Sequence, residues 1–218
     1  MTADLRPRDL EPSQPPRKSA AETLRGLAGT GDGDRITVEE IVEALGGNGF
    51  GLLVLALALP NAIPGPMIPG FSVPFALGII LLGLQIMGGN SRPLLPRWLR
   101  RRTITRVRFR RFIERADPWL SRFERRFKPR AARILHDSGR PRVLGLLIIL
   151  FALVLALPIP LGNGPEAFAI CVIGLGLFAS DGRVQTIGIV GGVLATCFNA
   201  AIVIAGLQLI RQATGVFG

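Results

Sequence analysis

The sequence predicts an all-α integral membrane protein with two repeated membrane hairpins and one C-terminal transmembrane helix. Each hairpin consists of a helix, a Pro-rich break and a second helix. Two blocks of the chain, 49–89 and 143–210, are almost uncharged and are interrupted only by Glu166, Asp181 and Arg183. Residues 184–210 contain no charge and exceed the roughly 18 apolar residues that indicate a transmembrane helix.

The two apolar blocks resemble each other. The tetrapeptide LALP at 57–60 recurs at 155–158. After the break, further identities recur at a constant offset of 91: Pro74, Ala76, Ile79, Gly83, Leu84 and Arg92 match Pro165, Ala167, Ile170, Gly174, Leu175 and Arg183. We therefore expect an internal repeat of the hairpin.

The first hairpin is predicted to reach only part of the way across a bilayer. Residues 49–59 extend about 16 Å as a helix, whereas the hydrocarbon core is roughly 30 Å thick. Four prolines between Pro60 and Pro69 then break the helix. Because proline donates no backbone hydrogen bond, carbonyls remain unpaired there, which is tolerated only beside protein or a water-filled cavity. Re-entrant hairpins and short spans both remain open.

A short amphipathic helix is predicted at ITVEEIVEAL, before the first hairpin. Thr37 is placed to cap it, with Glu40 reaching back to the cap and Ile36 and Ile41 at the positions of a hydrophobic staple. We expect residues 1–34 to be a disordered cytoplasmic tail, because its start is rich in proline and charge.

The segment between the hairpins is strongly basic. Residues 92–142 contain 18 basic and 4 acidic residues, a net charge of +14. Tethered between apolar blocks, such a segment indicates a cytoplasmic loop near anionic lipid, and we expect no nucleic-acid partner. Its periodicity predicts basic amphipathic helices, with a new helix beginning at Asp117 and Pro118. Candidate contacts to lipid headgroups or a protein partner are Arg108, Arg110, Arg111, Arg122, Arg125 and Arg126.

These boundaries divide the chain into five segments. They are a tail at 1–34, an amphipathic helix with the first hairpin at 35–91, basic cytoplasmic helices at 92–142, the second hairpin at 143–182 and a transmembrane helix at 183–218. The charge distribution predicts a multi-pass inner-membrane protein whose N-terminus and basic segment are cytoplasmic.

Several stretches together resemble one bacterial family. They are GFGLLVLALALPNAIPGP, PRWLRRR, ADPWLSRFERRFKPR and LALPIPLGNGPEAFAICVIGLGLFASDG. These residues resemble the ExoD family of exopolysaccharide-synthesis proteins over roughly residues 37–205. The resemblance implies a bacterial inner-membrane protein tied to exopolysaccharide production, and in rhizobial members to nodule invasion and tolerance of alkaline medium. It implies no catalytic residues.

Polar residues in the two breaks form the candidate site. If the breaks meet, the side chains of Asn61, Ser72, Asn163 and Glu166 gather there. Glu166 follows Pro165 at the predicted start of a half-helix, where free amides and the helix dipole favour a carboxylate. Ionisable groups inside a membrane usually mark an ion pathway, and paired broken helices build substrate sites in many transporters. The leading hypothesis is therefore a small transporter in which Glu166 binds a proton or cation.

A second hypothesis stands beside the transporter. Glu166 can lie at the outer interface, with the asparagines acting only as helix caps. The protein is then a non-catalytic partner or regulator whose arginine-rich helices dock on anionic lipid or on a polysaccharide synthase or exporter.

We expect neither enzymatic activity nor a metal or cofactor. No Ser–His–carboxylate set is present, His136 is the only histidine, and no metal-ligand spacing occurs. The glycines Gly188, Gly191 and Gly192 suit close helix contact, within the chain or in a homo-oligomer.

Overall fold

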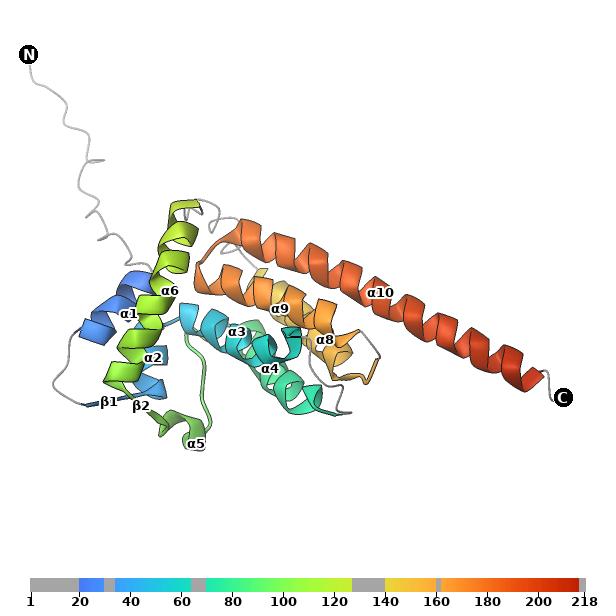
Figure 1. The fold of residues 1–218 in the computed structure, drawn as a ribbon, viewed down its shortest axis with the longest axis horizontal. Helices are drawn as coiled ribbons and strands as arrows, with labels where there is room; N and C mark the ends of the chain where they lie inside the picture. The colour runs from blue at the N-terminus through green and yellow to red at the C-terminus, as the bar shows by residue number, and fades with distance from the viewer. Residues whose placement is uncertain (1–19, 30–33, 64–69, 127–139, 160–161, 216–218) are drawn as a thin grey trace, which may run out of the picture.

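The computed structural model describes residues 20–29, 34–63, 70–126, 140–159 and 162–215. These residues form helices and one two-stranded sheet (Figure 1). In chain order the elements are α1 (Ala20–Gly29), β1 (Arg35–Thr37), α2 (Val38–Leu45), α3 (Asn48–Ala62), α4 (Ser72–Met87), α5 (Arg97–Arg100), β2 (Thr103–Thr105), α6 (Arg106–Arg126), α8 (Arg140–Ala156), α9 (Asn163–Phe178) and α10 (Gly182–Gly215).

The predicted capping box begins α2. The Thr37 side chain accepts a hydrogen bond of 3.1 Å from the Glu40 N–H, and the Glu40 carboxylate accepts one from the Thr37 N–H. Ile36 and Ile41 are buried in one apolar cluster that also contains Phe178 at the end of α9. This cluster therefore joins the N-terminal elements to the bundle of longer helices. Figure 1 shows these two groups of helices next to each other.

Two N-terminal features differ from the expectation. The disordered tail predicted for residues 1–34 is wrong for α1, because Ala20 and Leu24 are buried in the same cluster as residues of α6. Residues 1–19 lie outside the described part. The small sheet was not foreseen: β1 pairs antiparallel with β2, with Ile36 opposite Ile104. Strands of three residues are too short to produce a recognisable alternation.

The helical bundle is built from crossed hairpins. Helix α3 packs along α9, and α4 packs along α8, so the first helix of each hairpin lies against the second helix of the other. Glycines allow both contacts. A Cβ atom on Gly145 would lie 2.6 Å from the Gly83 carbonyl oxygen, and one on Gly174 would lie 2.9 Å from the Leu55 nitrogen. Only glycine permits such a close backbone approach.

The bundle helices are longer than half the hydrocarbon core of a bilayer but shorter than its full thickness of roughly 30 Å. Helix α3 includes Pro60 and ends at Ala62, later than the predicted end at residue 59. Pro60 lies in the last turn of α3, and because proline has no N–H, the carbonyl oxygen of Ala56 loses its intrahelical partner. The four bundle helices have 15, 16, 17 and 16 residues, about 23–26 Å at 1.5 Å per residue.

The predicted helix start at Asp117 is wrong. Helix α6 is continuous from Arg106 to Arg126 with Pro118 inside it. The carbonyl that Pro118 leaves unpaired belongs to Glu114; both residues are exposed, so solvent can satisfy that oxygen. The amphipathic character is confirmed, because Phe109 and Ile113 are buried beneath the helix.

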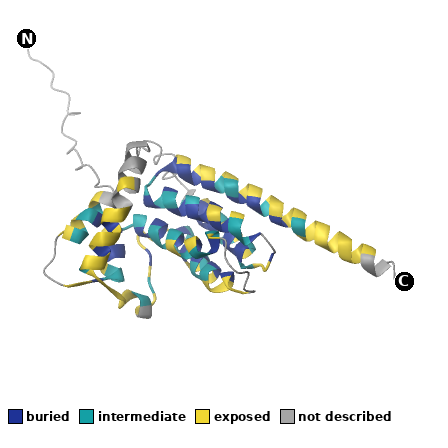
Figure 2. Cartoon of the chain, in the orientation of Figure 1, coloured by how far each residue is buried: buried dark blue, intermediate teal, exposed yellow. Residues whose placement is uncertain are grey.

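The C-terminal helix α10 matches the predicted transmembrane segment. Residues Gly182–Gln212 are long and apolar enough to cross a membrane, and 22% of the most apolar window is buried. A core helix of a soluble protein would be mostly covered, whereas exposure increases along α10 towards the C-terminus (Figure 2). The fold is therefore compatible with a helical membrane protein.

Candidate functional site

Glu166 lies in the first turn of α9, directly after the break in the second hairpin. Its exposed fraction is 0%. Gly162 occupies the cap position of the helix and provides no side-chain cap, so the first amides of α9 point towards this region without capping partners from that residue. The positive end of the helix dipole favours a carboxylate at this position.

Helix α10 supplies the partners of Glu166. The Thr196 hydroxyl donates a hydrogen bond of 3.1 Å to Glu166 Oε1, and Asn199 Nδ2 donates one of 3.4 Å to Oε2. Thr196 and Asn199 are three residues apart and so lie on one face of α10. Glu166 therefore accepts hydrogen bonds from two neutral donors, and none of the ion pairs among the described residues includes it.

Small residues bring α10 close enough for these bonds. A Cβ atom on Gly188 would lie 2.6 Å from Ile173 Cγ1, and one on Gly192 would lie 2.5 Å from the Phe151 ring. The expected close helix contact at these glycines is confirmed as a contact within the chain. Gly191 differs, because a Cβ atom there would meet only the Ala169 Cβ, at 3.8 Å.

The backbone of the break also joins the site. Asn199 Nδ2 donates a second hydrogen bond, of 3.3 Å, to the Gly162 carbonyl oxygen. A Cβ atom on Gly162 would overlap the Asn199 side chain and lie 2.9 Å from Ile159 Cγ2. Position 162 therefore requires glycine if Asn199 is to reach both the break and Glu166.

Among the described residues, one side-chain hydrogen bond joins the two breaks. Asn163 Nδ2 donates to Ser72 Oγ over 2.8 Å. Asn61 takes no part in this bond: its Nδ2 donates to the Leu57 carbonyl oxygen of its own helix, over 3.4 Å. Of the four predicted site residues, the structure thus joins Ser72 to Asn163, connects Glu166 to α10, and leaves Asn61 bonded within α3.

Buried oxygens without hydrogen-bond donors surround this region. The side-chain oxygens of Asn61, Asn163 and Asn199 are buried and have no hydrogen-bond partner within the described structure. A buried polar atom without a partner costs free energy, so these oxygens are able to accept a hydrogen bond from a donor that enters the site. Carboxylate and carbonyl oxygens suit a proton or a hard cation. Among the described residues no cluster of three His, Cys, Asp or Glu side chains could hold a metal ion.

Thr196 and Asn199, the partners of Glu166, were not assigned to the site from the sequence. Both stand in the same uncharged stretch, and the spacing of three between two polar residues was the available signal. What the sequence did not reveal is the partner, because Thr196 and Glu166 are 30 residues apart on different helices.

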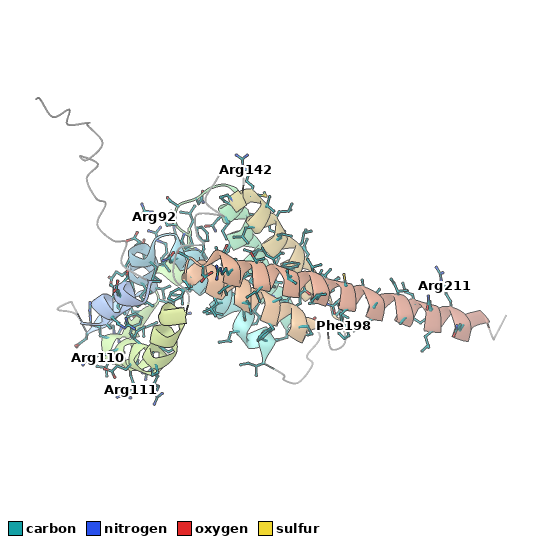
Figure 3. All side chains as sticks on the ribbon, turned by 90° about the horizontal axis from the view of Figure 1, so that it is seen from above. Arg92, Arg110, Arg111, Arg142, Phe198 and Arg211 are labelled. Atoms are coloured by element: carbon teal, nitrogen blue, oxygen red, sulfur yellow. The ribbon has the colours of Figure 1, made fainter. Side chains whose placement is uncertain are left out.

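The basic candidates lie on the other part of the molecule. Arg108, Arg110 and Arg111 are exposed on α6, and Arg110 forms an ion pair of 2.9 Å with Glu114. Figure 3 shows Arg110 and Arg111 on α6, away from the far end of α10, where Arg211 lies. The backbones of Arg122, Arg125 and Arg126 belong to the last turns of α6, and their side chains lie outside the described part.

A helical fold with one long apolar helix and a buried carboxyl group is compatible with a membrane protein that has an internal polar site. The family model described as "Exopolysaccharide synthesis, ExoD" matches residues 20–201. The chain belongs to the ExoD family, as its motifs predicted, and membership implies involvement in exopolysaccharide synthesis.

Two relatives support this assignment. The chain is similar to Protein ExoD of Rhizobium meliloti, with 32% identity over 169 residues that cover 76% of this chain and 70% of the relative. It is also similar to an uncharacterized protein of Synechocystis sp., with 31% identity over 145 residues covering 66% and 68%. No solved structure matches.

Proposed function

We propose that this chain is a bacterial inner-membrane protein of exopolysaccharide synthesis and export that works as a small proton- or ion-coupled transporter. The observation that carries the proposal is the fully buried Glu166 held between Thr196 and Asn199 at the start of a broken helix. A buried ionisable group in an apolar helical bundle is most readily explained as part of an ion pathway.

The proposal includes an internal repeat. Helix α4 spans Ser72–Met87 and α9 spans Asn163–Phe178, so both ends are related by the offset of 91. The helices also end alike. The N–H of Asn90 bonds to the Gln85 oxygen and that of Asp181 to the Gly176 oxygen, again 91 residues apart. Gly89 and Ser180, at equivalent positions, both have positive φ. Structural repeats, either inverted or in the same orientation as here, are a common transporter architecture, with binding sites at broken helices.

Re-entrant hairpins are the arrangement that fits the position of the breaks. Asn199 contacts the second break about 26 Å along α10 from Gly182, and α10 continues to Gly215. The uncharged stretch 184–210 therefore extends well past the break. If that whole stretch lies in the bilayer, the breaks and Glu166 lie within the hydrocarbon region.

The orientation follows from charge. Arg92 follows the end of α4, and Arg142 and Arg183 lie in the first turns of α8 and α10. Figure 3 shows Arg92 and Arg142 at the end of the bundle that faces the N-terminal elements. Basic residues favour the cytoplasmic side. We therefore infer that the N-terminus and residues 92–142 are cytoplasmic and that α10 crosses outwards.

The site can exchange a proton without leaving the carboxyl group unpaired. As a carboxylate, Glu166 accepts from Thr196 and Asn199. A protonated Glu166 has an O–H to donate. A rotation of the Asn199 amide then presents its unpartnered Oδ1 as the acceptor. The buried amide of Asn199 thus offers a hydrogen-bond partner to both the ionised and the protonated form of the Glu166 carboxyl group.

The test is dissipation of a pH gradient in liposomes that contain the purified protein and an internal pH-sensitive dye. Glu166→Gln keeps the size of the side chain and removes the titrating group, so flux should fall to that of empty liposomes. Glu114→Gln, on the exposed surface of α6, is the matched control and should retain full flux. Unchanged flux in Glu166→Gln would exclude Glu166 from transport.

A second candidate function rests on α6. Val107 and Phe112 are exposed among the arginines, with exposed fractions of 61% and 64%. Aromatic residues and arginines are enriched at protein interfaces. This surface favours a non-catalytic role, in which the protein docks on anionic lipid headgroups or on a polysaccharide synthase or exporter. Replacing Arg108, Arg110 and Arg111 by Glu should then stop exopolysaccharide output, while flux through liposomes would not depend on the docking.

A further inference from the structure

An apolar groove of about 460 Å³ lies between α9 and α10. It is separate from the polar contacts of Glu166, although residues next to Glu166 and Thr196 line one of its ends. Its walls contain only carbon-rich side chains and glycines: Pro165, Phe168, Val172, Ile187, Leu194 and Phe198 line it, with small residues beneath.

The groove floor is open because of one glycine. A Cβ atom on Gly191 would touch only the Ala169 Cβ, at 3.8 Å. At Gly188, about one turn earlier, Ile173 already fills the space where a side chain would lie. The rim consists of strongly exposed apolar side chains, with exposed fractions of 65% for both Phe168 and Leu194. The groove therefore opens outwards and not into the bundle.

The dimensions of the groove fit one leaflet of a membrane. Ile187 and Phe198 are eleven residues apart on α10, which corresponds to about 17 Å along the helix. One leaflet of a hydrocarbon core is about 15 Å deep. A chain lying in the groove would therefore extend from the interface to the middle of the bilayer.

A positively charged side chain lies at the interfacial end of the groove. Arg183 is exposed in the first turn of α10, four residues before Ile187 and so on the same helix face. Arginine binds phosphate groups well because its guanidinium group presents several donors. We propose that the groove binds one acyl chain of an anionic phospholipid of the cytoplasmic leaflet, with the lipid phosphate at Arg183. This site rests on the membrane placement of α10 given above, and not on transport by Glu166.

The test is photo-crosslinking in nanodiscs made mainly of phosphatidylcholine. A small fraction of phosphatidylglycerol carries a diazirine on its acyl chain, and mass spectrometry maps the labelled residues. We expect labels to concentrate on Phe168, Val172 and Leu194. Unlabelled phosphatidylglycerol should displace them, whereas added phosphatidylcholine should not.

Two glycine variants form a matched pair. Gly191→Leu fills the groove without backbone overlap and should reduce labelling there to that of other exposed positions. Gly206→Leu adds the same side chain where nothing lies within 4 Å and should leave labelling unchanged. Arg183→Gln should weaken competition by phosphatidylglycerol about fivefold, the typical contribution of one juxtamembrane arginine.

Three results would overturn the proposal, and each has a separate meaning. Equal labelling of the groove and of Leu77 and Leu81 on α4, with no dependence on the headgroup, would show bulk lipid only. Crosslinks between two protein chains at the groove would show that a second copy occupies it. Absence of label from Val203 and Leu207, on the free half of α10, would instead contradict the membrane placement itself.

Discussion

Asn163 and Ser72 begin the second helices of the two hairpins, lie 91 residues apart in the chain, and are joined by a hydrogen bond of 2.8 Å from Asn163 Nδ2 to Ser72 Oγ. The bond therefore joins equivalent positions of the two apolar blocks. It is also the side-chain contact that joins the two breaks within the described structure.

Removing either partner of this bond should destabilise the bundle. Ser72→Ala and Asn163→Ala should each lower the free energy of unfolding in detergent by about 1 kcal/mol, because a buried partner loses its hydrogen bond. In a double-mutant cycle the coupling energy should also be about 1 kcal/mol. Ser91→Ala, on an exposed residue, is the control. Additive losses would show that the two side chains do not support each other.

Gly162→Ala should destabilise the site through Asn199. The new Cβ atom would overlap the Asn199 side chain, and overpacking of this kind costs about 1–3 kcal/mol. Flux should decline as well, because Asn199 is displaced from Glu166. Gly164→Ala, two residues on, meets nothing within 4 Å and should match the wild type. Equal thermal stability and flux in both variants would contradict the tight contact at Gly162.

Local rules in the sequence were sufficient for much of the fold. The capping box at Thr37 and the long final helix both depend on residues close together in the chain. The start of α10 is also local, because Asp181 Oδ1 accepts hydrogen bonds from the N–H groups of Arg183 and Val184. The prediction at Pro118 was wrong. Proline usually occupies the first turn of a helix, but it is tolerated inside α6 because the Glu114 carbonyl that it leaves without a partner is on an exposed residue.

The candidate site was only partly predictable, because its contacts are tertiary. Ser72 and Asn163 were grouped on the condition that the two breaks meet, and the hydrogen bond between them fulfils that condition. Thr196 was missed because its hydrogen bond depends on how α10 packs, which the glycines of α10 decide. Asn61 was grouped with the other three residues only because it lies in a break of a predicted membrane hairpin. Its side-chain amide instead donates to a carbonyl oxygen of its own helix.

The N-terminal elements should lose stability in acid through the pair of Glu39 and Arg100. The hydrogen bond from the Arg100 guanidinium group lowers the pKa of Glu39 below its ordinary value of 4.5. A depressed carboxyl pKa stabilises the fold above 4.5, and this contribution is lost as the pH falls through the folded-state value. Arg100 is exposed and Glu39 is partly exposed, so solvent screens the pair and the effect should be small.

Thermal unfolding between pH 3 and pH 6 measures this contribution. The wild type should lose more stability on acidification than Glu39→Gln. Arg100→Gln should remove the same dependence, and the double variant should remove no more than either single one. A pH dependence that persists unchanged in Glu39→Gln would assign it to other carboxyl groups.

Thr196 should act as a positioning residue for Glu166, and two substitutions separate its hydroxyl group from its shape. Thr196→Val keeps the shape and removes the donor to Glu166 Oε1, which should reduce flux in liposomes and lower the free energy of unfolding by about 1.5–3 kcal/mol, the usual range for a hydrogen bond to a charged group. Thr196→Ser retains the hydroxyl group and should retain flux. Thr186→Val is the matched control on the same helix, because the Thr186 hydroxyl donates to the Gly182 carbonyl oxygen of its own helix, over 2.8 Å, and to no site residue in the described part of the chain. If Thr196→Val and Thr186→Val conduct equally while Glu166→Gln is inactive, Glu166 works without its α10 hydroxyl partner, and Asn199 alone orients the carboxyl group.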